Sequence, residues 1–242
     1  MRVAALYDIH GNAAALAAVL EEVPVDATVV IGGDIVLGPQ PAETLELLDP
    51  LGDRAHWIRG NCERAEPHTD RLWEERRLWT ERRLGERRRK SLAALPETLS
   101  LSVDGLGPTL FCHGSPRSDE EIITAITTEE RLREILAGVD EGVVVCGHTH
   151  HQFDRNAAGR RIVNAGSVGM PYEGRPGAYW ALLGPDVELR RTEYDVVAAE
   201  AALRALGYPG IDEAVETLFA SPPTADEAAE QFERQALGQA VS

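Results

Sequence analysis

The sequence predicts an α/β protein in which two β-sheets pack face to face between outer layers of helices. Two observations predict this fold class. Over residues 2–59, short apolar runs alternate with stretches of helical spacing, which indicates β-α units. Further short apolar runs follow between residues 98 and 191, and they are enough for a second sheet. A length of 242 residues is near the upper limit for one hydrophobic core, so we expect a single domain with small additions.

The first part of the chain contains three apolar runs and two helical stretches. Asn12 is a favourable N-cap residue and opens an Ala- and Leu-rich stretch that ends at Glu22. A second helix is expected over residues 41–48, because proline is tolerated in the first turn of a helix. The strands are expected over residues 2–7, 25–31 and 55–59.

The middle of the chain begins with a predicted hairpin. Residues 98–103 and 109–112 flank a turn that contains Asp-Gly. A helix over residues 129–136 then leads to an apolar strand over residues 142–146. The strands that close the second sheet are expected over residues 161–164, 178–183 and 187–191.

The C-terminal part of the chain is expected to be helical. It is rich in Ala from Asp195 onward, and Thr224 with Glu227 resembles a capping box. We therefore expect one domain over residues 1–192 with a helical insertion over residues 64–95, and a helical appendage over residues 193–242 that packs on the same domain.

Charge and composition limit the partners of this chain. The net charge of −16 argues against general binding to nucleic acids or membranes. No stretch approaches the roughly 18 apolar residues of a membrane span, and the first apolar run has no basic leader. Three cysteines at unrelated spacings fit a reducing compartment. These features predict a cytoplasmic protein, and they leave the oligomeric state open.

An Arg-rich segment, residues 64–90, departs from the acidic trend. It carries ten Arg and Lys against six Asp and Glu, with Trp73 and Trp79 interleaved. The favoured interpretation is a solvated helix that docks on the domain through its aromatic residues. The alternatives are a nucleic-acid contact or a lid that recognises anionic substrate, because the segment directly follows Asn61 and Cys62.

Residues that can bind metal follow five separate apolar runs. Most of these motifs alone would more often be a cap, turn or loop, and only the one that contains His148 and His150 is moderately specific for metal by itself. All five together predict two metal ions in one site. In a strand, residues i and i+2 point to the same face. Each of two such pairs is therefore expected to bind one ion: Asp8 with His10, and His148 with His150. The mixed oxygen and nitrogen donors favour Mn²⁺, with Fe, Zn²⁺ or Ni²⁺ as alternatives. The candidate ligands are Asp8, His10, Asp34, Asn61, His113, His148 and His150.

The motifs that contain these residues resemble the signature of the calcineurin-like metallophosphoesterases, in particular their small bacterial and archaeal phosphodiesterase branch. The similarity spans about residues 2–183. It implies that one ion is held by Asp8, His10 and His150 and the other by Asn61, His113 and His148, with Asp34 bridging. The motifs are Asp8-Ile-His10-Gly-Asn12, Gly33-Asp34, Gly60-Asn61-Cys62-Glu63, His113-Gly114 and Gly147-His148-Thr149-His150.

The resemblance implies a binuclear metal-dependent phosphodiesterase. It leaves the natural substrate open, and a small phosphoester is expected, with a nucleotide-like one as a candidate. A hydroxide that bridges the ions would attack phosphorus in line with the leaving group. The alternatives are a phosphomonoesterase, a dinucleoside polyphosphate hydrolase or a protein phosphatase of the same superfamily, or a metal-binding scaffold without catalysis. A nucleic-acid partner is not expected.

One candidate catalytic position departs from the family pattern. Asn61 and Cys62 are the candidate catalytic residues, but many relatives have a His in place of Cys62 that is thought to protonate the leaving oxygen. Its absence should slow poor leaving groups most, which favours aryl-like diesters. A thiol beside two divalent ions should also have a lowered pKa.

Four further residues are candidates for supporting roles. His68 and His151 could donate the missing proton, although ordinary solvated histidines fit both positions better. Arg117 could contact substrate phosphate, although a surface salt bridge is the favoured interpretation. Tyr7 stands where relatives have a small hydroxyl residue, and it is expected to crowd the rear wall of the site.

Overall fold

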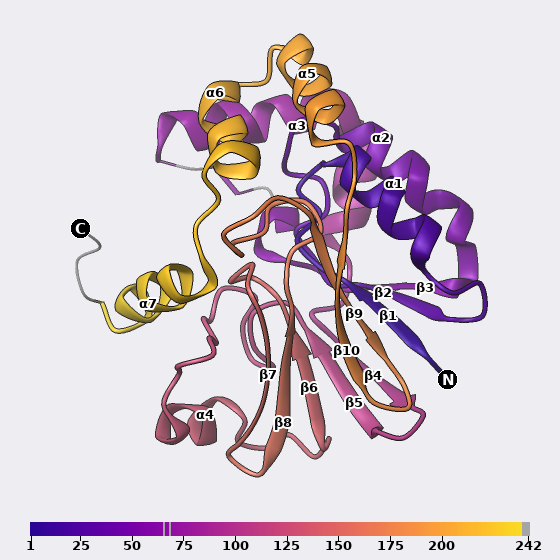
Figure 1. Ribbon diagram of the computed structural model, residues 1–242, viewed down its shortest axis with the longest axis vertical. Coiled ribbons are helices and arrows are strands. Elements are labelled where there is room, and N and C mark those ends of the chain that lie inside the picture. Colours follow the sequence, from indigo (N-terminus) through magenta and orange to yellow (C-terminus); the bar gives the residue numbers. More distant parts are fainter. Residues whose placement is uncertain (65, 68, 239–242) are drawn as a thin grey trace.

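The computed structural model describes residues 1–64, 66–67 and 69–238. Two five-stranded sheets pack face to face, and helices cover their outer faces (Figure 1). Three apolar layers result: one between the first sheet and its helices, one between the sheets, and one under the helix on the second sheet. The predicted two-sheet fold with outer helices is confirmed.

The first sheet contains the three parallel strands that the sequence predicted at the start of the chain. Two antiparallel strands extend it beyond β1, although the sequence analysis assigned these two to the second sheet. That assignment was wrong because an apolar pattern shows that a strand is buried but does not identify its neighbours. Across the sheet the strands are β10 (Val187–Thr192), β9 (Ala178–Leu183), β1 (Val3–Leu6), β2 (Thr28–Ile31) and β3 (Ala55–Trp57).

The second sheet contains the predicted hairpin and one strand that the sequence analysis missed. That strand is β7, which has only Phe153 and Ala157 fully buried and lies at the edge of the sheet, so it lacks a clear apolar pattern. Across the sheet the strands are β4 (Thr98–Val103), β5 (Gly107–Cys112), β6 (Val143–Cys146), β8 (Arg160–Ala165) and β7 (Gln152–Ala157).

The outer helices form where the sequence predicted them. The Asn12 side chain caps α1 by accepting a hydrogen bond from the backbone N–H of Ala15 at 3.1 Å. Leu16 and Leu45 are among the residues that pack these helices on the first sheet. The helices and helical turns of the domain are α1 (Ala13–Glu22), α2 (Pro41–Leu48), η1 (Asp49–Arg54), η2 (Asn61–Arg64), α3 (Arg71–Ala93) and α4 (Glu129–Ile135).

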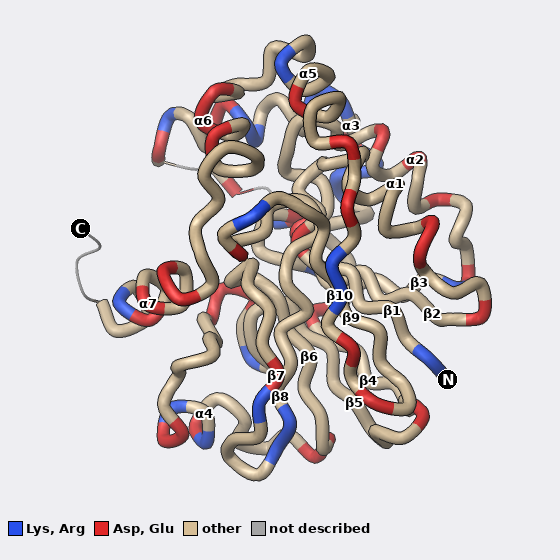
Figure 2. The backbone as a smooth tube through the Cα atoms, viewed as in Figure 1, with Lys and Arg blue, Asp and Glu red and all other residues tan. Residues whose placement is uncertain are grey.

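The Arg-rich helix α3 docks on the domain, as the favoured interpretation predicted. Trp79 is buried and its indole N–H donates to the carbonyl of Pro39 at 3.1 Å, whereas Trp73 stays partly exposed. Arg77 pairs with Glu74 and Glu81 on its own helix, and Figure 2 shows blue and red residues interleaved along this region. The acidic neighbours therefore offset part of the basic charge of this helix.

The C-terminal region is helical, and its last helix stands apart from the others. Its elements α5 and α6 lie near α3, while α7 lies beside the second sheet (Figure 1). The predicted capping box of Thr224 and Glu227 is present at the start of α7. None of the described helices is both long and apolar enough to cross a bilayer. The bounds are α5 (Val196–Leu206), α6 (Ile211–Val215), the π-helical turn η3 (Glu216–Ala220) and α7 (Ala225–Ala236).

Candidate metal centre

The loops after β1, β2 and β6 carry five candidate ligands in a left-handed backbone conformation. Strand β1 ends at Leu6 and β6 at Cys146, so the expected strand geometry does not continue through the two i, i+2 pairs. Each left-handed residue other than Gly is strained by about 1–3 kcal/mol, and such strain clusters at functional sites. The φ angles are 52° at Asp8, 46° at His10, 51° at Asp34, 66° at His148 and 57° at His150.

Hydrogen bonds between these loops hold the strained backbone. The backbone N–H of His10 donates to the carbonyl of Asp34 at 2.9 Å. The backbone N–H of His148 donates to Oδ2 of Asp8 at 2.9 Å, and the Ser167 hydroxyl donates to the Asp8 carbonyl at 2.7 Å. These hydrogen bonds join the loops after β1, β2, β6 and β8, four segments that are far apart in the sequence, into one frame.

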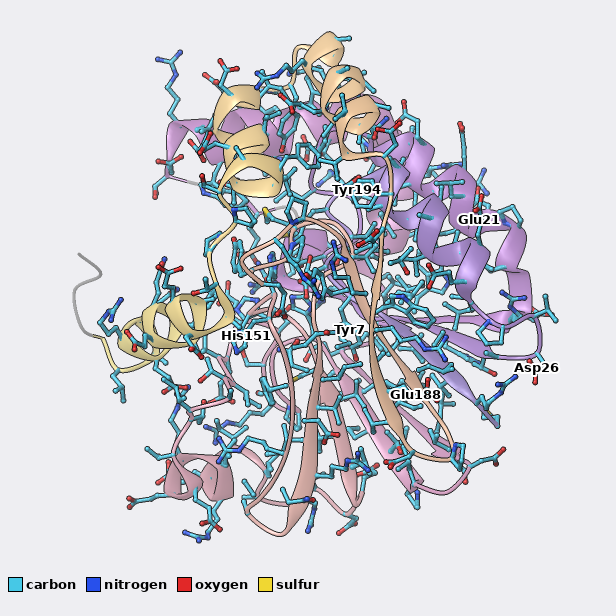
Figure 3. All side chains as sticks on the ribbon, in the orientation of Figure 1. Tyr7, Glu21, Asp26, His151, Glu188 and Tyr194 are labelled. Atoms are coloured by element: carbon cyan, nitrogen blue, oxygen red, sulfur yellow. The ribbon has the colours of Figure 1, made fainter. Side chains whose placement is uncertain are left out.

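Tyr7 forms the rear wall of this frame, between the two sheets (Figure 3). Its hydroxyl donates to the carbonyl of Val145 at 3.2 Å. A Cβ atom at Gly32 would lie 2.2 Å from the Tyr7 ring, and one at Gly147 would lie 2.5 Å from it. Both loops therefore need glycine where they pass the ring.

Ligand atoms of five predicted ligands, and of Cys62, which was not predicted as a ligand, converge in three overlapping groups. Within each group the atoms lie within 4.8 Å of one another, and Asp8 and Asp34 each belong to two groups. His148 borders them, with its ring 5.2 Å from the ring of His113, and Asn61 adjoins Cys62. The groups are Asp8 with His10 and His150, Asp8 with Asp34 and His113, and His10 with Asp34 and Cys62.

Backbone carbonyls fix the orientation of two candidate ligands, His10 and His150. Nδ1 of His10 lies 3.2 Å from the Leu37 carbonyl, and Nδ1 of His150 lies 2.8 Å from that of Met170. Because a carbonyl only accepts, each Nδ1 carries a proton, which leaves the two Nε2 atoms to face the cluster. The two Nε2 atoms face each other at 3.1 Å, an arrangement that a cation between them stabilises.

Three candidate ligands also have buried polar atoms without a hydrogen-bond partner. They are Oδ1 of Asp8, Oδ1 of Asn61 and Nε2 of His113. A buried polar atom without a partner typically costs about 1–3 kcal/mol. Metal coordination would satisfy all three atoms, so the residues present fit a metal centre.

The charges of the cluster also favour a cation. Burial alone would raise the pKa of Asp34, yet the neighbouring imidazoles of His113 and His10 hold it well below its ordinary value. Burial opposes the charge on His113, but Asp34 and Asp8 raise its pKa to about 10. Burial and His113 lower the pKa of His148 to about 4. Without metal, the carboxylates thus keep a proton on His113 that a bound ion would displace.

Glu63 organises two of the ligand loops, a role that the sequence analysis did not assign. Its buried carboxylate accepts hydrogen bonds from the backbone N–H groups of Asp34 and Ile35, both at 2.8 Å, and of Gly60 at 2.9 Å. Burial and the charge of Asp34 raise its pKa to about 7. The only sequence signal was its place in the Gly60-Asn61-Cys62-Glu63 motif.

Cys62 lies at the edge of the cluster, half-buried. Its backbone N–H donates to Oδ1 of Asp34 at 2.9 Å and its thiol to Oδ2 at 3.0 Å. Burial and the Asp34 charge raise the pKa of the thiol well above its ordinary value in the metal-free chain. This direction is opposite to the one expected beside two divalent ions, so a lowered pKa stays a prediction for the metal-loaded protein.

The remaining candidates lie away from the cluster or are occupied by other contacts. Arg117 is exposed and pairs with both carboxylate oxygens of Glu121, at 2.6 and 2.8 Å, as the salt-bridge interpretation predicted. His151 is buried rather than solvated, and its Nδ1 lies 3.0 Å from the Thr149 carbonyl. The expected role of His68 falls outside the described residues.

A sequence model of the calcineurin-like phosphoesterase superfamily domain matches residues 1–184, which include every candidate ligand. The chain belongs to the calcineurin-like phosphoesterase superfamily. Two solved structures are similar to this phosphoesterase over 90% of its length. They are the hypothetical protein PH1004 from Pyrococcus horikoshii OT3 (23% identity, TM-score 0.78, 97% of that chain) and a metallophosphoesterase from Sphaerobacter thermophilus (28% identity, TM-score 0.74, 98% of that chain). A search of curated proteins gave no significant match.

Proposed function

We propose that this phosphoesterase is a binuclear, metal-dependent phosphodiesterase. One observation carries the proposal: the two carboxylate oxygens of Asp34 face different histidines. Oδ2 lies 3.8 Å from Nε2 of His10, and Oδ1 lies 3.5 Å from Nε2 of His113. A carboxylate in this position can bridge two ions, one on each side.

The ligands divide into a closed side and an open side. Asp8 and His113 are buried at the rear, whereas Asn61, Cys62 and His148 are partly exposed. Bound divalent ions would supply Lewis-acid activation of the phosphoryl group and a hydroxide nucleophile near neutral pH. Substrate would enter past the partly exposed residues, where the amide of Asn61 can donate a hydrogen bond to a phosphoryl oxygen. The frame built by Glu63 and Ser167 keeps these groups in place.

We place this reaction in the cytoplasm. All three cysteines are unpaired, which supports a reducing compartment.

Metal removal tests the proposed function. A chelator should stop hydrolysis of bis(p-nitrophenyl) phosphate, and Mn²⁺ should restore it best because mixed nitrogen and oxygen donors suit this ion. The diester should have a higher kcat/KM than p-nitrophenyl phosphate. The control is chelator already saturated with Mn²⁺, which should leave the protein active. Full activity in protein shown to be metal-free by elemental analysis would end the proposal.

The second prediction concerns the leaving group. Without an imidazole at position 62, the rate should fall steeply as the pKa of the leaving alcohol rises, so aryl diesters should react much faster than alkyl diesters. Cys62→His should flatten this dependence. A series of aryl and alkyl diesters measured on both proteins gives the two slopes, and equal slopes would contradict the prediction.

The activity of Cys62→Ser shows whether the Cys62 thiol takes part in the chemical step. A thiolate near neutral pH is a poor proton donor. Aryl-diester activity of Cys62→Ser should therefore stay within roughly tenfold of wild type, below the 10²–10⁴-fold that a general acid typically contributes. A loss of roughly a thousandfold or more with unchanged metal content would show that the cysteine takes part in the chemistry.

A further inference from the structure

A continuous row of aromatic rings borders the metal centre. The ring of Tyr172 lies 4.9 Å from that of His150, and the ring of Phe232 lies 6.4 Å from that of His148. Tyr172 and Phe232 stack on each other with centroids 6.3 Å apart and an angle of 28° between their planes. Both rings are partly exposed. Two aromatic side chains thus lie next to two candidate ligands, one of which belongs to the open side.

Core packing does not account for this pair. Neither Tyr172 nor Phe232 belongs to any of the hydrophobic clusters that the described residues form. The fully buried residues of α7 are Ala228 and Ala229. Phe232 lies one turn after these two residues on the same face of α7, and its ring lies beside His148 and Tyr172 rather than in one of the hydrophobic clusters.

Two contacts on different segments hold this pair in place. The backbone N–H of Tyr172 donates to the carbonyl of His150 at 2.9 Å, which fixes the Tyr172 loop to a ligand loop. The backbone N–H of Gly174 donates to the carbonyl of Pro223 at 2.8 Å, which joins the same loop to the segment before α7. The ring of Tyr172 is thus positioned relative to both the centre and α7.

The helix that carries Phe232 is anchored by the next residue in the chain. The Glu233 carboxylate accepts hydrogen bonds from the hydroxyls of Thr124, at 2.8 Å, and Thr127. It also pairs with Arg131 at 3.1 Å, and both side chains of this ion pair are mostly buried. An aromatic side chain on such an anchored helix loses little freedom when a ligand stacks on it.

We propose that Tyr172 and Phe232 form a stacking platform for a planar aromatic group of the substrate, as in the nucleobase of a nucleotide ester. The proposal rests on the proposed function, because it places the phosphate at the metal centre and the base on the rings. It assigns a substrate-recognition role to α7, which lies beyond the residues 1–184 that the family model matches. Stacking of a base on an aromatic side chain is strong and tolerates different bases, so the platform selects nucleotides as a class.

Binding of two phosphate monoesters that differ in the base tests the platform without requiring turnover. Isothermal titration of the Mn²⁺-loaded protein should show that AMP binds about 5- to 150-fold more tightly than ribose 5-phosphate, the range expected for one stacked base. Phe232→Ala and Tyr172→Ala should each remove most of this difference by weakening AMP binding alone. The matched control is Leu237→Ala, which removes an exposed side chain at the end of the same helix.

Two more variants separate stacking from helix packing. Phe232→Leu keeps an apolar side chain on α7 but removes the aromatic face, so it should lose the AMP preference with an unchanged melting temperature. Phe232→Trp should keep the preference. If Phe232→Leu retains the AMP preference, the contact is only apolar and the proposal is overturned.

Other outcomes distinguish failure of the stacking platform from failure of the proposed phosphodiesterase activity. Equal affinity of the wild-type protein for AMP and ribose 5-phosphate would overturn the platform while leaving metal-dependent hydrolysis intact. A strong AMP preference without hydrolysis of any diester would support the platform and contradict the proposed function. If Phe232→Ala speeds aryl and alkyl diesters equally, α7 obstructs the entrance instead of recognising substrate, and the platform is wrong.

Discussion

Asp34→Asn should lower kcat/KM for bis(p-nitrophenyl) phosphate by roughly a thousandfold or more, because metal assistance is expected to supply much of the roughly 10⁶-fold or larger acceleration of an enzyme. The carboxylate faces His10 with one oxygen and His113 with the other. An amide has one oxygen and no charge, so it cannot bridge two cations. Both ions should therefore bind more weakly at once.

Kinetics and elemental analysis on the same samples check this result. Asp34→Asn should contain less than two Mn²⁺ per chain at concentrations that saturate the wild-type protein. Asp26→Asn is the matched control, because Asp26 is an exposed carboxylate that pairs with Arg2 (Figure 3). If Asp34→Asn keeps both ions and wild-type activity, Asp34 does not bridge them.

Glu63→Ala should lower the free energy of unfolding by at least about 3 kcal/mol, because three buried N–H groups lose their acceptor at about 1–3 kcal/mol each. The loops that carry Asp34 and Asn61 would also lose their shared anchor, so kcat should fall even where the protein is folded. Glu63→Gln retains one acceptor oxygen and should lie between the wild type and Glu63→Ala.

Denaturant unfolding and steady-state kinetics measure these two effects. The control is Glu188→Ala, which removes an exposed carboxylate from β10 that pairs only with the nearby Arg190 among the described ion pairs (Figure 3). It should stay within about 0.5 kcal/mol of wild type. A Glu63→Ala variant as stable and active as Glu188→Ala would show that the three hydrogen bonds do not hold the site together.

Local sequence signals predicted much of the fold. Asn12 and Thr224 act as N-caps where their side chains indicated, and the helix over Pro41–Leu48 has its predicted bounds. The sheet that contains β9 and β10 could not be predicted, because pairing between distant strands depends on tertiary contacts. Strand β7 was missed because only Phe153 and Ala157 are buried on its inner face, with the polar Arg155 between them, so the strand shows no clear apolar alternation.

The candidate ligands came from the sequence, but their arrangement did not. A motif such as Gly147-His148-Thr149-His150 gives residue types and spacing, yet the left-handed backbone at His148 and His150 depends on contacts with other loops. Phe232 gave no local signal of a role, and the only signal of Glu63 was its place in the motif that begins at Gly60. Their roles follow only from the three-dimensional structure. The Glu63 carboxylate binds the backbone of the Asp34 loop, and α7 brings Phe232 beside His148.

Titration of the metal-free protein with Mn²⁺ shows whether Asp34 bridges two ions in one centre, when low-temperature electron paramagnetic resonance and diester hydrolysis are measured on the same samples. We expect two Mn²⁺ per chain, a spectrum of two exchange-coupled ions, and activity that rises with the second equivalent. Full activity with one ion per chain, or two ions that show no coupling, would contradict a centre bridged by Asp34.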